Sequence, residues 1–113
     1  MSHPVIHFEI GCIDKTKTSV FYADAFGWKI DAGPMGMIQT GSSEGIQGHI
    51  AALGHEPHQF THIYVQTDDI AGSLERIAEL GGKTVVPPVT IPNGTFAWFS
   101  DPEGNVVGLW KPA

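Results

Sequence analysis

Hydrophobic and polar residues alternate in two short stretches of the chain, at about residues 4–11 and 59–67. In the first stretch Phe8 lies on the apolar face, whereas His7 and Glu9 lie on the opposite face. A period of two is typical of a half-buried strand. The pattern therefore predicts two strands, each with one apolar face and one face that carries titratable or aromatic side chains.

Apolar residues spaced three and four apart follow each of these strands, which is helical spacing. We expect helices at about residues 14–26 and 68–81. Asp14 is a suitable N-cap for the first helix. Gly27 and the pair Gly81-Gly82 are typical of helix ends.

Six shorter apolar stretches, three after each helix, are separated by turn residues such as Gly, Pro and Asn, and each predicts a strand. We expect these strands at about residues 28–31, 35–40, 46–53, 83–86, 95–100 and 105–110.

The two halves of the chain repeat the same order of elements. The segment His7–Asp14 recurs as His62–Asp69, which begins 55 positions later. A repeat of this length indicates a duplicated supersecondary unit. The sequence therefore predicts an α+β fold and a single domain, residues 1–113, built from module one (about 1–54) and module two (about 55–113).

The charge and composition exclude several classes of partner. Twelve acidic residues against six basic ones give a net charge of −6, and no basic patch for nucleic acid or an anionic membrane can be assembled from them. No apolar run approaches the length of a membrane span, and the N-terminus lacks the pattern of a secretion signal. A single cysteine, Cys12, forms no internal disulfide. We expect a cytoplasmic protein with no nucleic-acid or membrane partner.

Six segments of the chain together form a recognisable set of motifs. They are His7–Asp14, Phe21-Tyr22, Phe26-Gly27-Trp28, His62–Asp69, Leu80-Gly81-Gly82 and Asp101-Pro102-Glu103-Gly104-Asn105. These motifs resemble the vicinal oxygen chelate superfamily, which includes glyoxalase I, bleomycin-resistance and extradiol dioxygenase proteins. The resemblance covers nearly the whole chain and implies tandem βαβββ modules, with two curled mixed sheets that enclose a cleft.

The resemblance also implies a place for a metal. In the metalloenzymes of this family, His or Glu side chains on the first and fourth strands of each module hold a divalent ion, which chelates vicinal oxygens of the substrate or binds dioxygen. The first-strand positions match His7 and His62, and the fourth-strand positions match Gly48 and Gly108. Because glycine has no donor atom in a side chain, we expect no tightly bound metal and no other cofactor. If a divalent metal were bound, its ligands would be His7, His62 and Glu9.

The polar faces of the first strands provide the other candidate site residues. Glu9 is either a catalytic general base, if burial raises its affinity for protons, or a solvated glutamate at a strand edge. The glycines either open the floor of a cavity or permit close backbone approach, and the aromatic rings either stack on a ligand or fill the core. The predicted ligand-binding residues are His7, Glu9, Gly48, His62, Tyr64, Trp98, Gly108 and Trp110.

Three functions remain open at this stage. The first is a small-molecule-binding member of the family without the full metal site. The second is a metal-dependent glyoxalase-like lyase or isomerase, or a dioxygenase. The third is a non-catalytic structural or regulatory protein. We expect a homodimer in each case, because two small curled sheets leave long edges that a second copy would cover.

Overall fold

The computed structural model describes residues 2–113 and contains two helices and eight strands in the order βαβββ–βαβββ. This confirms the α+β class and the two modules. The chain forms two compact units, one of residues 7–62 and the other of the residues up to Ile6 together with Ile63–Ala113. The single domain and the cleft between curled sheets stay predictions.

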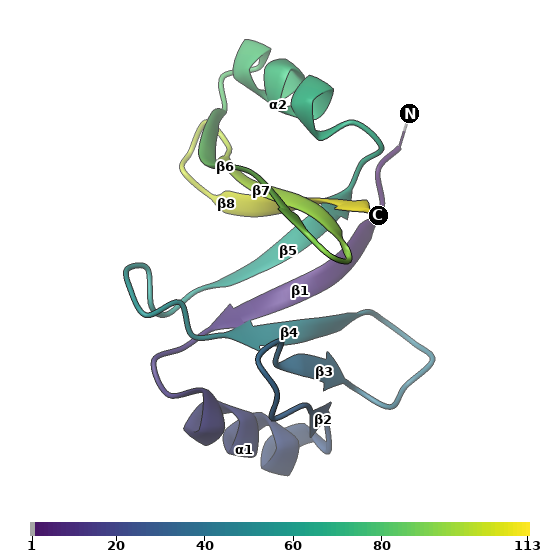
Figure 1. Cartoon of the computed structure of the whole chain (residues 1–113), viewed down its shortest axis with the longest axis vertical. Coiled ribbons are helices and arrows are strands. Elements are labelled where there is room, and N and C mark those ends of the chain that lie inside the picture. The colour runs from purple at the N-terminus through teal and green to yellow at the C-terminus, as the bar shows by residue number, and fades with distance from the viewer. Residues whose placement is uncertain (1) are drawn as a thin grey trace. The chain divides into compact units, whose positions relative to one another are not determined.

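The unit of residues 7–62 contains one helix beside a four-stranded sheet (Figure 1). The strand order is β2-β3-β4-β1, with β1 and β4 parallel and the other pairs antiparallel. The elements are β1 (Val5–Gly11), α1 (Lys15–Phe26), β2 (Lys29–Ile30), β3 (Met37–Gln39) and β4 (Gln47–Ala51).

Helix α1 begins and ends where its capping residues predict. The Asp14 carboxylate accepts a hydrogen bond from the Lys17 backbone N–H at 3.0 Å. Gly27 closes the helix with φ = 72°, and its N–H donates to the Ala23 carbonyl at 2.8 Å. Glycine adopts this left-handed conformation at little cost.

The apolar face of this sheet packs against α1. Cys12, Ile38 and Ile50 are its buried residues, and Cys12 is therefore a core thiol. The partly buried residues that surround them are Phe8, Ile10, Tyr22, Trp28 and Ile30.

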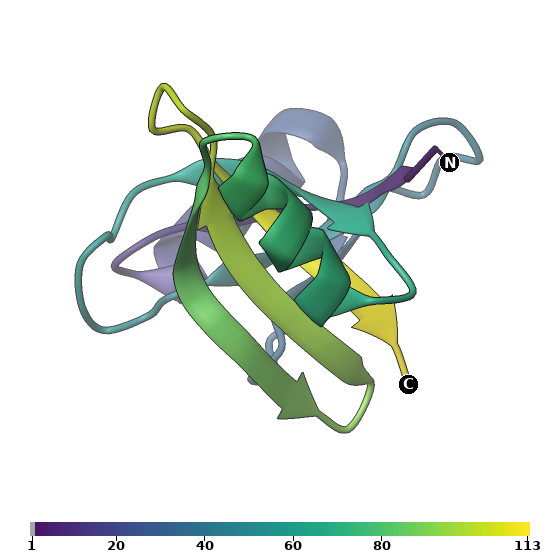
Figure 2. The ribbon, with the colours of Figure 1, turned by 90° about the horizontal axis from the view of Figure 1, so that it is seen from above.

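The second unit repeats this arrangement, with strand order β5-β8-β7-β6 and with β5 and β8 parallel. Helix α2 packs against β6, β7 and β8 (Figure 2), and Ile70, Ala97 and Leu109 form the buried core there. The elements are β5 (Thr61–Gln66), α2 (Ile70–Glu79), β6 (Lys83–Ile91), β7 (Gly94–Ser100) and β8 (Val106–Pro112).

Strand β6 is longer than the sequence pattern predicts, because it continues through Pro87 and Pro88 to Ile91. It lies at the edge of the sheet, where proline needs no ladder hydrogen bond on the outer side. Its register with β7 shifts between Thr84 and Val86 and again between Val86 and Val89. An edge position and irregular pairing thus accommodate residues that would end a central strand.

Neither helix within residues 2–113 is long and apolar enough to cross a membrane.

Candidate functional site

A buried carboxylate lies on the face of β1 that points away from α1. Glu9 is 2% exposed, and its Oε1 is 2.9 Å from Nε2 of His62, which is 8% exposed. Phe8 and Ile10 pack in the α1 core, so the alternation of the strand places Glu9 on the opposite side. An ionised group this deeply buried needs partners, because desolvation of a charge is costly.

His49 connects Glu9 to His7. The His49 Nε2 is 3.4 Å from Glu9 Oε1, and its Nδ1 is 2.7 Å from Nε2 of His7. The rings of His7 and His49 also stack, with centroids 4.9 Å apart. We call His7, Glu9, His49 and His62 the histidine–glutamate cluster. All four belong to the unit of residues 7–62.

Strand pairing and one glycine bring these side chains together. The parallel register places Glu9 opposite His49. The Gly11 N–H donates to the Phe60 carbonyl at 2.7 Å, which holds the segment before His62 against β1. The Phe60 ring occupies the space that a Cβ on Gly11 would need, so only glycine permits this approach.

The register also shows why the sequence analysis missed His49. Tyr64 lies opposite Gly108 in the second unit, and Glu9 lies opposite His49 in the first. Since Glu9 and Tyr64 are equivalent in the repeat, His49 and not Gly48 is the counterpart of Gly108. The assignment of the fourth-strand position to Gly48 was therefore one residue too early. The alternation of Gly48 and Ile50 with His49 was the signal that could have placed His49 on the polar face.

Gly48 therefore lies outside the histidine–glutamate cluster. It pairs with Phe8, whose ring and carbonyl fill the space where a Cβ would be. Phe8 packs against the α1 core, so Gly48 permits close packing on that side of the sheet. Its predicted role at the floor of a binding cavity stays a prediction.

The remaining predicted site residues gather in the second unit. Trp98 Nε1 donates to the Tyr64 hydroxyl at 2.9 Å, and both residues are buried. The Tyr64 ring lies over Gly108 and fills the space above it. Trp110 is opposite Phe96 in the β7–β8 pair and is partly buried. Gly108 thus accommodates an aromatic ring, and its predicted role in ligand binding stays a prediction.

The electrostatics of the histidine–glutamate cluster keep His7 neutral at pH 7. The pKa of His7 is lowered from 6.5 to about 4, chiefly by burial and next by His49, while the Glu9 carboxylate opposes the shift and His62 adds to it. A neutral imidazole can donate from one ring nitrogen and accept at the other. His7 can therefore form hydrogen bonds to a ligand without introducing charge.

The cluster has the donor types of a divalent-metal site, but its arrangement does not fit one. Among residues 2–113, no group of three or more His, Cys, Asp or Glu side chains is placed to hold a metal ion. The 2.7 Å contact between His7 and His49 also requires a proton on one of the two nitrogens. A protonated nitrogen has no lone pair for a metal.

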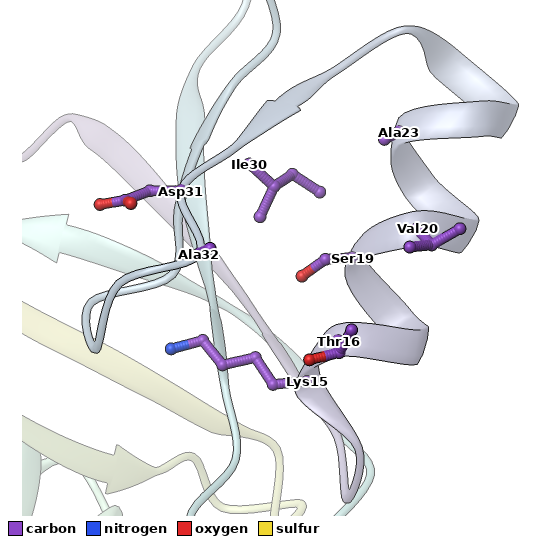
Figure 3. A pocket seen from close by; sticks show the side chains of 8 residues that line it. All are labelled: Lys15, Thr16, Ser19, Val20, Ala23, Ile30, Asp31 and Ala32. Atoms are coloured by element: carbon purple, nitrogen blue, oxygen red, sulfur yellow. The ribbon is translucent and has the colours of Figure 1, made fainter.

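A separate hollow of about 280 Å³ lies between α1 and the chain around β2 (Figure 3). Ile30 points toward the helix, and the Lys15 ammonium group donates to the carbonyl oxygens of Gly33 (3.0 Å) and Pro34 (2.8 Å). None of the predicted site residues lines it. The lining residues are Lys15, Thr16, Ser19, Val20, Ala23, Ile30, Asp31 and Ala32.

Comparison with protein families gives a match over most of the chain. The family model described as Glyoxalase/Bleomycin resistance protein/Dioxygenase superfamily matches residues 5–109. This range includes the histidine–glutamate cluster and the Tyr64–Trp98 pair.

Two curated relatives and one solved structure are similar to the chain. A "Glyoxylase-like domain-containing protein" from Didymella fabae is 29% identical over 108 residues, which cover 86% of this chain and 84% of the relative. The "Putative glyoxylase CFP32" of Mycobacterium bovis is 26% identical over 87% of this chain, which spans only 41% of that relative. The hypothetical protein BH1468 from Bacillus halodurans C-125 has a TM-score of 0.74 at 13% identity, with 100% of this chain and 96% of that chain covered, which shows a shared fold.

Proposed function

Because the chain belongs to the glyoxalase/bleomycin resistance protein/dioxygenase superfamily, we propose that it binds a small molecule at the histidine–glutamate cluster without the full metal site of the family. The observation that carries this proposal is the buried Glu9 carboxylate, held by His62 on the polar face of β1. The apolar core of this unit lies on the other face of the sheet. Burying titratable groups costs free energy, and clusters of such groups are typical of functional sites.

Each residue of the cluster has a distinct part in the proposal. His7 and His49, which are partly exposed, donate and accept hydrogen bonds to the ligand. His62 orients the carboxylate of Glu9. If the protein is an enzyme, Glu9 is the general base, which takes a proton from the bound molecule. The ligand-binding roles of Tyr64 and Trp98, which belong to the second unit, stay predictions from the sequence.

Thermal-shift screening of the purified protein against a panel of small metabolites tests the proposal. A compound that stabilises the wild type should lose its effect in Glu9→Gln and in His62→Ala. The control is His58→Ala, because His58 lies in the segment between β4 and β5 and pairs with Glu56. A hit that survives both cluster substitutions would place the binding site elsewhere.

A metal-dependent lyase or dioxygenase is the second candidate, because the cluster combines three imidazoles with one carboxylate. Metal analysis of the native protein separates the two proposals. Stoichiometric metal that is lost in His7→Ala and in His62→Ala, but retained in His58→Ala, would replace the first proposal with the second.

We further propose that the protein is a cytoplasmic homodimer without nucleic-acid or membrane partners. The net charge of −6 supports the exclusion of polyanionic partners. The edge strands β2 and β6 support the dimer, since a second copy would cover them.

A further inference from the structure

One face of helix α1 combines exposed apolar side chains with exposed charges. Val20 and Phe21 are 54% and 62% exposed, and Lys17 and Asp24 are exposed as well. The last three of these positions in the chain follow Lys17 by three, four and seven residues, so all four side chains lie on one face of the helix. We call Lys17, Val20, Phe21 and Asp24 the α1 stripe.

The core of the unit leaves the α1 stripe uncovered. Tyr22 packs against the core, where its ring stacks on that of Trp28 with centroids 5.6 Å apart. Phe21 meets the Tyr22 ring edge-on at 5.1 Å and is still mostly exposed, and none of residues 15–26 is buried. Adjacent exposed apolar side chains with charges at their rim are typical of a contact between proteins.

The two charges of the α1 stripe oppose the dipole of the helix. Lys17 lies in the first turn, which contains no acidic residue, and Asp24 lies in the last turn, which contains no basic residue. The helix dipole favours the reverse arrangement. Within residues 2–113 neither side chain forms an ion pair. The isolated helix therefore gains nothing from these charges, and each is available to an opposite charge from outside.

The order of residues in the α1 stripe is complementary to itself. Consider two copies of α1 that pack antiparallel about a twofold axis between positions 20 and 21. Lys17 of each copy then faces Asp24 of the other, because these two positions are equally far from the axis. By the same symmetry Val20 faces Phe21. Two ion pairs therefore flank an apolar centre made of two valines and two phenylalanines.

We propose that the α1 stripe is a contact between two copies of the chain, packed antiparallel, in which Lys17 of each copy pairs with Asp24 of the other. This inference rests on the proposed homodimer and names its interface. A partner of unrelated sequence would have to supply both charges at this spacing, whereas a second copy carries them.

Sedimentation equilibrium of the wild type, Lys17→Glu and Asp24→Lys tests the interface. Each substitution brings like charges together twice, because the contact is symmetric, and should raise the dissociation constant of the dimer about tenfold. Both variants should fold, since each places at its end of the helix the charge that the dipole favours. Lys111→Glu makes the same change of charge at an exposed position in β8 and should dimerise as the wild type does.

An equimolar mixture of the Lys17→Glu and Asp24→Lys variants tests the antiparallel pairing itself. In the mixed dimer the new glutamate of one chain faces the new lysine of the other, and the two unchanged side chains face each other. Both contacts then join opposite charges, so the mixture should recover the dimer that each variant alone has lost.

The apolar centre of the α1 stripe has its own matched pair of substitutions. Phe21→Ala should also raise the dissociation constant of the dimer about tenfold, because it removes an aromatic ring from the centre of the contact. Leu80→Ala removes a side chain of similar exposure, 63%, at the end of α2 and should leave the dimer unchanged.

Three results would overturn the inference. A wild-type protein that stays monomeric at all concentrations would reject the homodimer together with this interface, and would leave the proposed ligand binding untouched. Dimers that persist in Lys17→Glu, Asp24→Lys and Phe21→Ala would keep the homodimer and reject α1 as its interface. A mixture of the two charge variants that stays monomeric would reject the antiparallel pairing.

Discussion

At the residue scale, His7 shows how burial changes chemistry that the sequence only suggests. Its pKa in the folded protein falls from 6.5 to about 4, first because of desolvation and second because of His49. The sequence placed His7 on a polar face, where an ordinary pKa would be expected. The lowered value follows from burial and from a neighbour that is 42 residues away in the chain.

The lowered pKa predicts how stability depends on pH. Between pH 6.5 and about 4 the unfolded state binds a proton at His7 that the folded state does not, so this group reduces stability as pH falls through that range. Below pH 4 the destabilisation by His7 is complete. At 1.36 kcal/mol per pKa unit, the upper limit of this loss in the free energy of unfolding is about 3 kcal/mol.

Urea unfolding at pH 4, 5, 6 and 7 measures the effect of His7. The loss of stability on acidification should be smaller in His7→Asn than in the wild type, whereas His55→Asn, an exposed site, should behave as the wild type. Equal acid sensitivity in His7→Asn and the wild type would contradict the assignment.

Gly108 provides a second prediction at this scale. Because the Tyr64 ring fills the space above it, Gly108→Ala should displace that ring and break its hydrogen bond with Trp98. We expect a loss of about 1–3 kcal/mol in the free energy of unfolding, as for other overpacked sites, measured by urea unfolding with tryptophan fluorescence. Gly33→Ala is the control, because the nearest atom to a new Cβ there would be the carboxylate end of the exposed Asp31 side chain, 3.2 Å away, and not a buried ring. If Gly108→Ala left the free energy of unfolding unchanged, the Tyr64 ring would have to move freely.

At the element scale, α1 depends on its caps more than on burial. None of residues 15–26 is buried, whereas α2 buries Ile70. A helix with so little burial is stabilised to a larger extent by local interactions such as N-capping.

Asp14→Ala should therefore cost about 1 kcal/mol of stability, because it removes the acceptor for the Lys17 N–H. Thermal unfolding followed by circular dichroism measures this loss. Asp24→Ala makes the same chemical change in the last turn of the helix, where no N-cap hydrogen bond is lost, and should cost less than half as much. Equal losses at both positions would argue against a special role for the cap.

At the scale of the whole molecule, the predicted homodimer is open to direct measurement. Light scattering at micromolar concentration should give twice the monomer mass of 12.1 kDa. Helix α1 exposes apolar side chains that a second copy could cover, among them Val20, Phe21 and Phe26. Monomer mass throughout the concentration range would reject the dimer.

The amino-acid sequence by itself determined the order of the elements and the face on which His7, Glu9 and His62 lie. Strand alternation, helical spacing and the caps Asp14 and Gly27 are local signals, which depend on residues a few positions apart. The family resemblance was also readable, because its motifs are short and contiguous.

Only the tertiary structure decided which strand positions meet. The pairing of β1 with β4 brought His49 to Glu9 and moved Gly48 to the core side. Because side chains alternate along a strand, a shift of one residue exchanges the two faces, and the repeat could not specify that shift. Burial of Glu9 and the pKa of His7 depend on the same pairing, since desolvation arises from the neighbours that the register selects.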